Sequence, residues 1–140
     1  MKGNGKVNLT GIGRIYRKQE RSTFIDVPRS RFMEALEKLK RRGLTRISSI
    51  TGYDSGNGFE VIYHFDSGGH LVNIKVKLPA AKPSIGTITK HFPGAELFER
   101  ELMEMLGVKV EGHPNPEKLF LCEDSPKCPL RKALKGGNNG

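Results

Sequence analysis

Two stretches near the middle of the chain alternate between apolar and polar side chains. In residues 59–66 the odd positions are all large and apolar, and in residues 70–78 the even positions from 72 onward are apolar. A period of two puts successive side chains on opposite faces of a β-strand. The connecting Ser67-Gly68-Gly69 suits a tight turn. The pattern therefore predicts an antiparallel hairpin that buries one face.

A longer period appears before this hairpin. Phe32, Leu36 and Leu39 recur at i, i+4 and i+7, which predicts an amphipathic helix with a basic outer face. Gly43 supplies the stop for this helix. Strand candidates flank the helix at residues 23–27 and 44–53, and the stretch 11–16 is a candidate edge strand.

The segment after the hairpin is predicted to be mostly helical. Ser84, which follows Pro83, is placed to cap a short helix that extends to about His91. A second apolar stripe predicts a helix over residues 95–106, and a short strand over residues 108–110 follows it. The order of elements predicts an α+β fold class, a small and mostly antiparallel sheet covered by helices on one face, with an extended proline-rich C-terminal tail.

We divide the chain into a basic N-terminal arm of residues 1–21, an α+β domain of residues 22–110 and an extended tail of residues 111–140. A chain of 140 residues can bury a single core. No apolar run approaches the ~20 residues that a membrane-spanning helix needs, and the N-terminus lacks the apolar segment of a signal peptide. We therefore expect a soluble protein that is made in the cytoplasm.

Positive charge is concentrated in the first part of the chain. Residues 1–50 hold 13 Lys and Arg against 4 acidic residues, whereas residues 51–140 hold 11 of each. A basic region of this kind is typical of proteins that bind nucleic acid, anionic lipid headgroups or an acidic protein surface. A solvated basic face that only keeps the protein in solution explains the same numbers, so charge alone leaves the partner open.

The residues that carry cofactor chemistry in other proteins are sparse. Cys122 and Cys128 are too few to ligate an iron–sulfur cluster, and a zinc site that adds His113 lacks a fourth ligand. We expect two free thiols. Gly11-Ile12-Gly13 is followed by Arg14 and does not have the pattern of a phosphate-binding loop, so we expect no nucleotide site. The sequence thus predicts a chain without a cofactor of its own.

A charged motif in the second predicted helix has a different character. Glu99-Arg100-Glu101 is followed by Glu104 and Gly107, and then by Gly112-His113-Pro114 in a sharp turn. A carboxylate at the edge of an apolar stripe can accept hydrogen bonds from a neighbouring backbone. These residues could therefore tie the tail to its own domain or contact another subunit. A histidine held in a turn could also act as a base, but no nucleophile accompanies it, and we interpret His113 as a turn residue that hydrogen-bonds to the backbone.

This motif resembles the signature of the respiratory complex I 30 kDa subunit family, which includes members from NADH:quinone oxidoreductases and the counterpart subunit of membrane-bound energy-converting nickel–iron hydrogenases. The resemblance continues on both sides of the motif, in Tyr63-His64-Phe65-Asp66, Phe92-Pro93-Gly94-Ala95, Glu123-Asp124 and Pro129-Leu130-Arg131-Lys132. The residues that this resemblance marks as candidates for partner binding are Glu99, Arg100, Glu101, Glu104, Gly107, Gly112, His113 and Pro114.

The resemblance implies a non-catalytic peripheral subunit on the cytoplasmic side of a membrane complex. Such a subunit packs beside the large subunit that carries the quinone site or the nickel–iron centre, close to the iron–sulfur small subunit. It binds no cofactor itself, and its tail lies extended over the partner. The sequence departs from the usual family pattern at Met103, Glu117, Cys122 and Ser125. The divergent tail, together with a chain shorter than typical NADH-linked members, favours a hydrogenase-type or related ferredoxin-linked complex.

Two other interpretations of the chain are less well supported. A free-standing basic RNA-binding domain would fit the charge, but Phe59, Tyr63 and Phe65 are expected in the core and cannot form a stacking platform for bases. We expect no specific binding of nucleic acid. A small hydrolase that uses His113 lacks a recognisable nucleophile.

Overall fold

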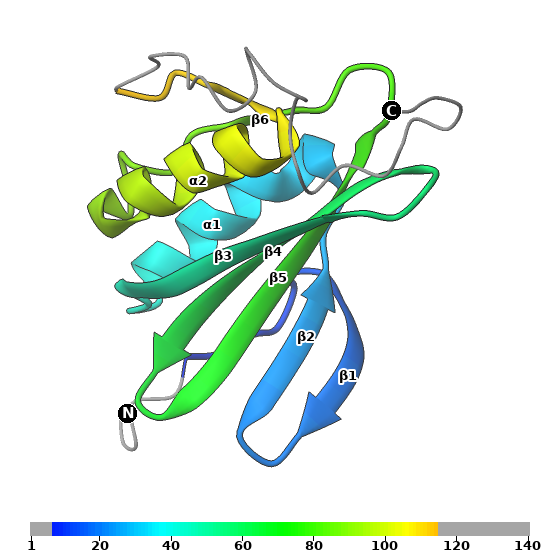
Figure 1. Ribbon diagram of the computed structural model, residues 1–140. Coiled ribbons are helices and arrows are strands. Elements are labelled where there is room, and N and C mark those ends of the chain that lie inside the picture. The colour runs from blue at the N-terminus through cyan, green and yellow to red at the C-terminus, as the bar shows by residue number, and fades with distance from the viewer. Residues whose placement is uncertain (1–6, 115–140) are drawn as a thin grey trace.

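The computed structural model describes residues 7–114 of the chain. Figure 1 shows a twisted sheet with two helices beside it. The sheet has five strands in the order β1-β2-β5-β4-β3. The bounds of these strands are β1 Arg14–Gln19, β2 Ser22–Asp26, β3 Arg46–Asp54, β4 Gly58–Ser67 and β5 His70–Pro79.

The central hairpin forms as its alternating pattern predicts. β4 and β5 pair antiparallel over their full length, from Gly58 opposite Pro79 to Ser67 opposite His70. The apolar residues at the alternating positions 59–65 and 72–78 are buried, whereas their neighbours, including the exposed Leu71, point to the other face. The α+β fold class is therefore confirmed, with a sheet that is mostly antiparallel and covered on one face.

The first two strands join the sheet in an arrangement that the pattern does not reveal. β1 and β2 form a hairpin, and β2 then pairs in parallel with β5, from Ser22 opposite Leu71 to Asp26 opposite Lys75. β1 is an edge strand, and it lies within residues 1–21, the segment predicted to be an arm. The adjacent Ile12 is buried in the core.

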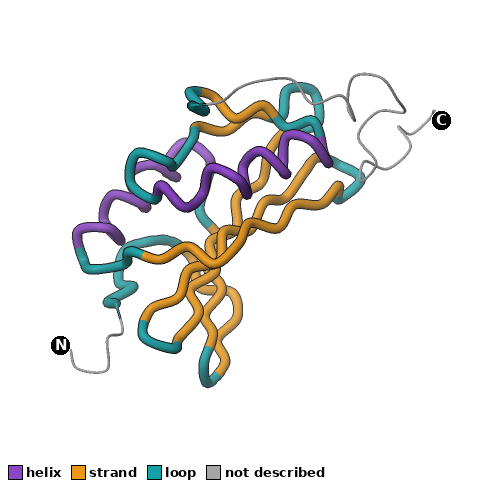
Figure 2. Tube along the Cα trace, turned by 60° about the vertical axis from the view of Figure 1, so that its left-hand side comes forward, coloured by secondary structure: helices purple, strands orange, loops and turns teal. Residues whose placement is uncertain are grey.

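Both helices lie on the same side of the sheet (Figures 1 and 2). The helix α1, Phe32–Arg41, follows a short 3-10 turn, η1, Arg29–Arg31. The helix α2, Glu96–Leu106, follows a second such turn, η2, Pro93–Ala95, and packs on β3. Within residues 7–114, no helix is long and apolar enough to cross a membrane.

The core lies between the helices and the sheet. The rings of Phe32 and Tyr63 are 4.7 Å apart between centroids, and those of Phe65 and Phe92 are 4.9 Å apart. The hydroxyl of Tyr63 is buried without a hydrogen-bond partner among the described residues. Burial, and secondarily the charge of Glu99, raises the pKa of Tyr63 well above its ordinary value.

One predicted element is wrong. The segment that follows Pro83 forms no helix up to His91; instead it opens with a short strand, β6, Ser84–Gly86, which pairs in parallel with β7, Lys109–Glu111. The N–H of Thr87 extends this pairing by donating to the carbonyl of Glu111 at 2.8 Å. Because these backbone groups are bonded to a distant part of the chain, they are not available for a local helix.

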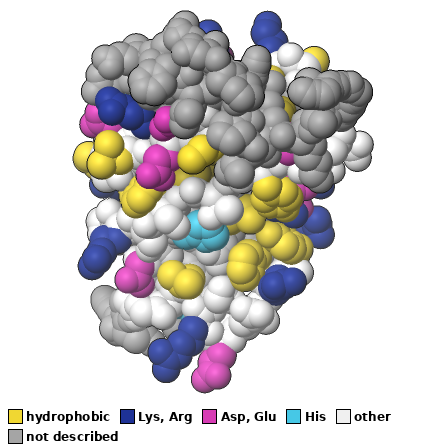
Figure 3. Space-filling view, viewed as in Figure 1, with side chains coloured by type: hydrophobic (Ala, Val, Ile, Leu, Met, Phe, Trp, Pro, Cys, Tyr) yellow, Lys and Arg dark blue, Asp and Glu magenta, His cyan; other side chains and the backbone are white. Residues whose placement is uncertain are grey.

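The face of the sheet that carries no helix has its own network of side chains. Lys75 lies over the ring of Tyr16, with 4.3 Å between Nζ and the ring centroid, and pairs with Glu60 at 3.7 Å. Tyr53 donates its hydroxyl hydrogen bond to the same Glu60, which together with burial raises the pKa of Tyr53 to about 12. The surface turned to the viewer in Figure 3 mixes hydrophobic side chains with Lys and Arg, and a histidine lies near its centre.

Candidate functional site

The first acidic residue of the charged motif is buried inside the domain. Glu99 belongs to α2 and has no exposed surface. Its Oε1 accepts a hydrogen bond from the Thr87 hydroxyl at 2.6 Å, and its Oε2 accepts one from the Ile88 N–H at 2.8 Å. This carboxylate therefore fastens α2 to the segment that follows β6.

The turn after β7 is fastened to the same helix. Gly112 adopts a φ of 80°, a conformation that favours glycine, and this turn places His113 against the start of α2. The Nε2 of His113 lies 3.0 Å from the carbonyl oxygen of Glu96, to which its N–H donates, and 3.8 Å from Oε1 of Glu99. His113 thus hydrogen-bonds to the backbone and also lies beside the buried carboxylate.

The environment of Glu99 acts on its pKa in both directions. Burial disfavours the charged carboxylate and raises its pKa above the ordinary value, and the nearby Glu96 adds to this effect. The hydrogen bonds from Thr87 and Ile88 and the proximity of His113 favour the charged form and lower it. Burial is the largest of these causes, so the pKa of Glu99 remains raised.

This raised pKa predicts a specific pH dependence of stability. Above the ordinary Glu pKa of 4.5, folded Glu99 retains its proton at pH values where the unfolded chain has lost it. The free energy of unfolding should therefore fall as the pH rises from about 4.5 through the raised pKa. Glu99→Gln can still accept from Ile88 and donate to Thr87, but it does not titrate. Urea unfolding of both proteins across this pH range measures the difference between their free energies of unfolding. As the pH rises, the wild type should lose stability relative to Glu99→Gln. An unfolding free energy that depends on pH in the same way in both proteins would contradict a raised pKa of Glu99.

The structure divides the motif between the interior and the surface. Gly107 ends α2 with a φ of 72°, the left-handed conformation for which glycine is preferred. Arg100 is half-buried, and its Nε has no hydrogen-bond partner among the described residues. Glu99 and His113, the inner cluster, are buried; Glu101, Gly112 and Pro114 are exposed, and Arg100, Glu104 and Gly107 are half-buried.

The partners of Glu99 could not be identified from the sequence. Thr87 and Ile88 contribute a hydroxyl and a backbone N–H, and neither has a pattern that marks it in the sequence. The sequence indicates only that donors are needed, because Glu99 lies at the border of an apolar stripe and a buried carboxylate requires hydrogen-bond donors. The helix wrongly predicted over residues 84–91 concealed where those donors lie.

The inner cluster can position chain segments but is not arranged to bind a metal. Among residues 7–114, no group of three or more His, Cys, Asp or Glu side chains is placed to hold a metal ion. Cys122 and Cys128 lie outside the described residues, as do Glu123-Asp124 and Pro129-Leu130-Arg131-Lys132. The cluster joins α2, the segment after β6 and the turn after β7 into one unit.

Comparison with known proteins identifies related chains. A subunit of the NADH-quinone oxidoreductase of Moorella thermoacetica is 31% identical over 114 residues, which cover 78% of this chain and 77% of that protein. A longer subunit of the NADH-quinone oxidoreductase of Phocaeicola vulgatus is 33% identical over 113 residues, which cover 77% of this chain but only 22% of that protein. The chain thus spans about a fifth of the second relative.

Two solved structures have the same fold. A trypsin-resistant fragment of Nqo5 superposes with a TM-score of 0.66 at 26% identity, covering 73% of this chain and 88% of the fragment. A chain of the membrane-bound sulfane sulfur reductase, an archaeal respiratory membrane complex, superposes with a TM-score of 0.76 at 25% identity, covering 88% of this chain and 77% of that one. Neither likeness supports the RNA-binding alternative.

The family model described as respiratory-chain NADH dehydrogenase, 30 Kd subunit, matches residues 25–139. That range contains the end of β2, all the strands from β3 onward, both helices and the whole charged motif. The fold, the relatives and the motif agree, and the chain therefore belongs to the 30 kDa subunit family of respiratory-chain NADH dehydrogenases.

Proposed function

We propose that this chain is a non-catalytic peripheral subunit of a membrane-bound energy-converting oxidoreductase of the complex I or nickel–iron hydrogenase type. In this proposal it packs against the large subunit and the iron–sulfur small subunit on the cytoplasmic side of the membrane. The iron–sulfur clusters belong to the partners, and this chain binds no cofactor. The family supports this role, because its relatives carry the names of respiratory complex subunits.

The outer face of α2 is the observation that carries the proposal. Leu97 is 65% exposed, the largest exposed fraction among the exposed large apolar side chains of the described residues. Glu101 and Glu104 follow it at i+4 and i+7, so the three residues form one stripe along the helix. A single apolar anchor within a polar rim is the usual composition of a protein interface.

The inner cluster positions the start of the tail beside the outer face of α2. Glu99 and His113 fix the turn at which the described chain ends, so the start of the tail has a defined position beside α2. The stripe of Leu97, Glu101 and Glu104 and the start of the tail therefore form one surface. We propose that this surface binds the large subunit.

Assembly with the partner subunits tests the proposal. Leu97→Asp should abolish co-purification of the tagged chain with the large subunit, and Glu101→Ala should weaken it, while circular dichroism of the isolated chain stays unchanged. Both side chains are exposed, so the fold does not depend on them. Arg100→Ala should also weaken assembly, but its half-buried guanidinium makes it a less specific probe.

Glu20→Ala is the matched control, because it removes the same charge from the exposed turn between β1 and β2. It should assemble like the wild type. Full assembly and wild-type turnover of the complex with Leu97→Asp would show that α2 does not contact the partner.

A further inference from the structure

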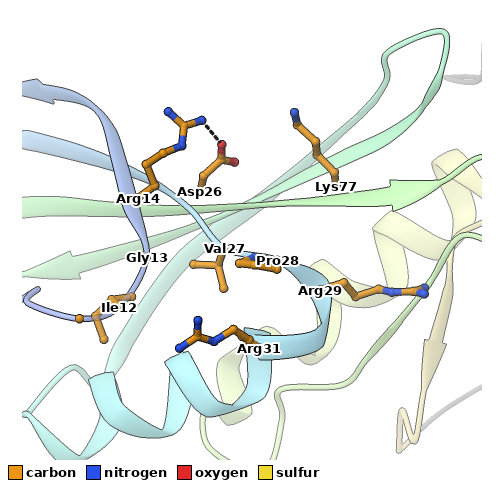
Figure 4. A pocket seen from close by; sticks show the side chains of 10 residues that line it. Ile12, Gly13, Arg14, Asp26, Val27, Pro28, Arg29, Arg31 and Lys77 are labelled. Carbon is orange, nitrogen blue, oxygen red and sulfur yellow. Dashed lines mark hydrogen bonds and ion pairs between the residues drawn. The ribbon is translucent and has the colours of Figure 1, made fainter.

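A groove of ≈ 670 Å³ opens where β2 leaves the sheet (Figure 4). Its apolar floor contains Val27 and Pro28, and the segment before β1 contributes Ile12. Figure 4 places Arg31 on the α1 side of this floor and Lys77 on the opposite side. The groove thus presents positive charge on both sides of an apolar strip.

The cations of the groove differ in whether they are already engaged. Arg14 pairs with Asp26 at 2.7 Å, and Arg29 donates to the carbonyl oxygen of Ser84 at 3.0 Å. The side chains of Arg31 and Lys77 have no hydrogen bond or ion pair among the described residues. Two unpaired cations from distant parts of the sequence therefore line one groove, whose lining acid, Asp26, is already paired with Arg14.

Next to the groove, the edge of β5 at Lys77 has no neighbouring strand. The parallel ladder between β2 and β5 ends where the N–H of Val27 donates to the carbonyl oxygen of Lys75 at 2.9 Å. Because backbone groups point to the same side at every second residue, the N–H and C=O of Lys77 face the side from which β2 has departed. Among the described backbone hydrogen bonds, none continues the ladder at Lys77.

The segment before β1 passes close to the end of β2. A Cβ on Gly13 would lie 2.5 Å from the carbonyl oxygen of Asp26, so only glycine fits there.

From this geometry we infer that the groove binds a short extended segment of a partner protein with two consecutive acidic residues. The segment pairs with the N–H and C=O of Lys77 as an added strand. Successive side chains of a strand point to opposite faces, so one carboxylate meets the Lys77 ammonium and the next meets the Arg31 guanidinium. The inference is independent of the α2 contact proposed above, because the two surfaces share no residue.

An extended acidic segment suits the groove better than a bare phosphate. The two free cations lie on opposite sides of the apolar floor (Figure 4). A strand supplies backbone groups for Lys77 and one carboxylate on each of its two faces. It also covers Val27 and Pro28 with its aliphatic atoms.

Blocked hexapeptides titrated into the full chain test this inference by NMR. One probe has Asp-Glu at the centre of a Val/Thr sequence, and a second separates the same two acids by one residue, which places both carboxylates on one face. The first should bind about threefold more tightly than the second, which loses one of the two ion pairs, and should shift the amide signals of Gly13 and Lys77. N-methylation at the residue opposite Lys77 should weaken the first peptide about fivefold. Equal affinities of the two peptides would overturn the inference.

Substitutions assign the contacts. Arg31→Gln and Lys77→Gln should each reduce affinity about threefold and together about tenfold, and Arg31→Lys should restore most of the loss. Lys90→Gln, which removes an exposed charge outside the groove, is the control and should bind like the wild type. An equal loss in the control would mean that binding is non-specific attraction, contrary to the inference.

Two competition experiments decide between occupants. Full displacement of the peptide by pyrophosphate or by vesicles of anionic phospholipid at equal charge concentration would identify a general anion site and overturn the strand. A gain in peptide affinity in the full chain with Glu123→Gln and Asp124→Asn would assign the groove to the chain's own tail rather than to a partner. Unchanged affinity in both experiments supports a partner segment.

Discussion

Glu99→Ala should lower the free energy of unfolding by about 3 kcal/mol, because it leaves one buried and one partly buried donor without their acceptor. The N–H of Ile88 and the hydroxyl of Thr87 both donate hydrogen bonds to the Glu99 carboxylate. Each orphaned group costs roughly 1 to 3 kcal/mol when water cannot replace the lost partner. The midpoint of urea unfolding measures the loss.

Glu101→Ala is the internal comparison, since it removes an exposed carboxylate two positions along the same helix. Its unfolding free energy should change by no more than about 0.5 kcal/mol. Similar losses in the two variants would mean that helix charge, and not the buried hydrogen bonds, determines stability here. The signal of His113 in NMR spectra should shift only in the Glu99 variant.

The contact between α2 and β3 should respond to Gly52→Val with a loss of about 2 kcal/mol from overpacking. A Cβ at this position would lie 2.5 Å from Cδ1 of Leu102 and 2.7 Å from Cδ1 of Leu106, and valine adds two methyl groups beyond it. The leucine ends can move to admit one carbon, so Gly52→Ala should be tolerated far better. Chemical denaturation of both variants gives the comparison, and an equal loss in both would point to the backbone of β3 instead of its packing.

The sequence predicts those elements whose pattern of apolar residues allows only one secondary structure and one register. Residues 59–66 alternate so regularly that a shift by one residue would expose Phe59 and Phe65, and the hairpin register follows from this. The stripe that contains Leu36 and Leu39 determines α1 in the same way.

The remaining features depend on contacts between distant residues. The parallel pairing of Ser22 with Leu71 has no local signal, because either edge of the central hairpin could accept β2. The strand at Ser84 looks like a capped helix until its partner β7 is known. The donors for Glu99 and the open edge at Lys77 are likewise products of tertiary structure, so the sequence predicted the motif but not its contacts.

The parallel pairing of β2 with β5 also has a consequence for how the chain is made. The side chains of Ser22 and Asn73 hydrogen-bond although they lie 51 residues apart. At the ~5–20 residues per second of protein synthesis, β2 leaves the ribosome roughly 3 to 10 s before its neighbour exists. An isolated two-stranded hairpin is only marginally stable, whereas the strands β3, β4 and β5 form through local contacts. The N-terminal hairpin is therefore the last part of the sheet to dock, and the part of a nascent chain that a chaperone can hold for the longest time.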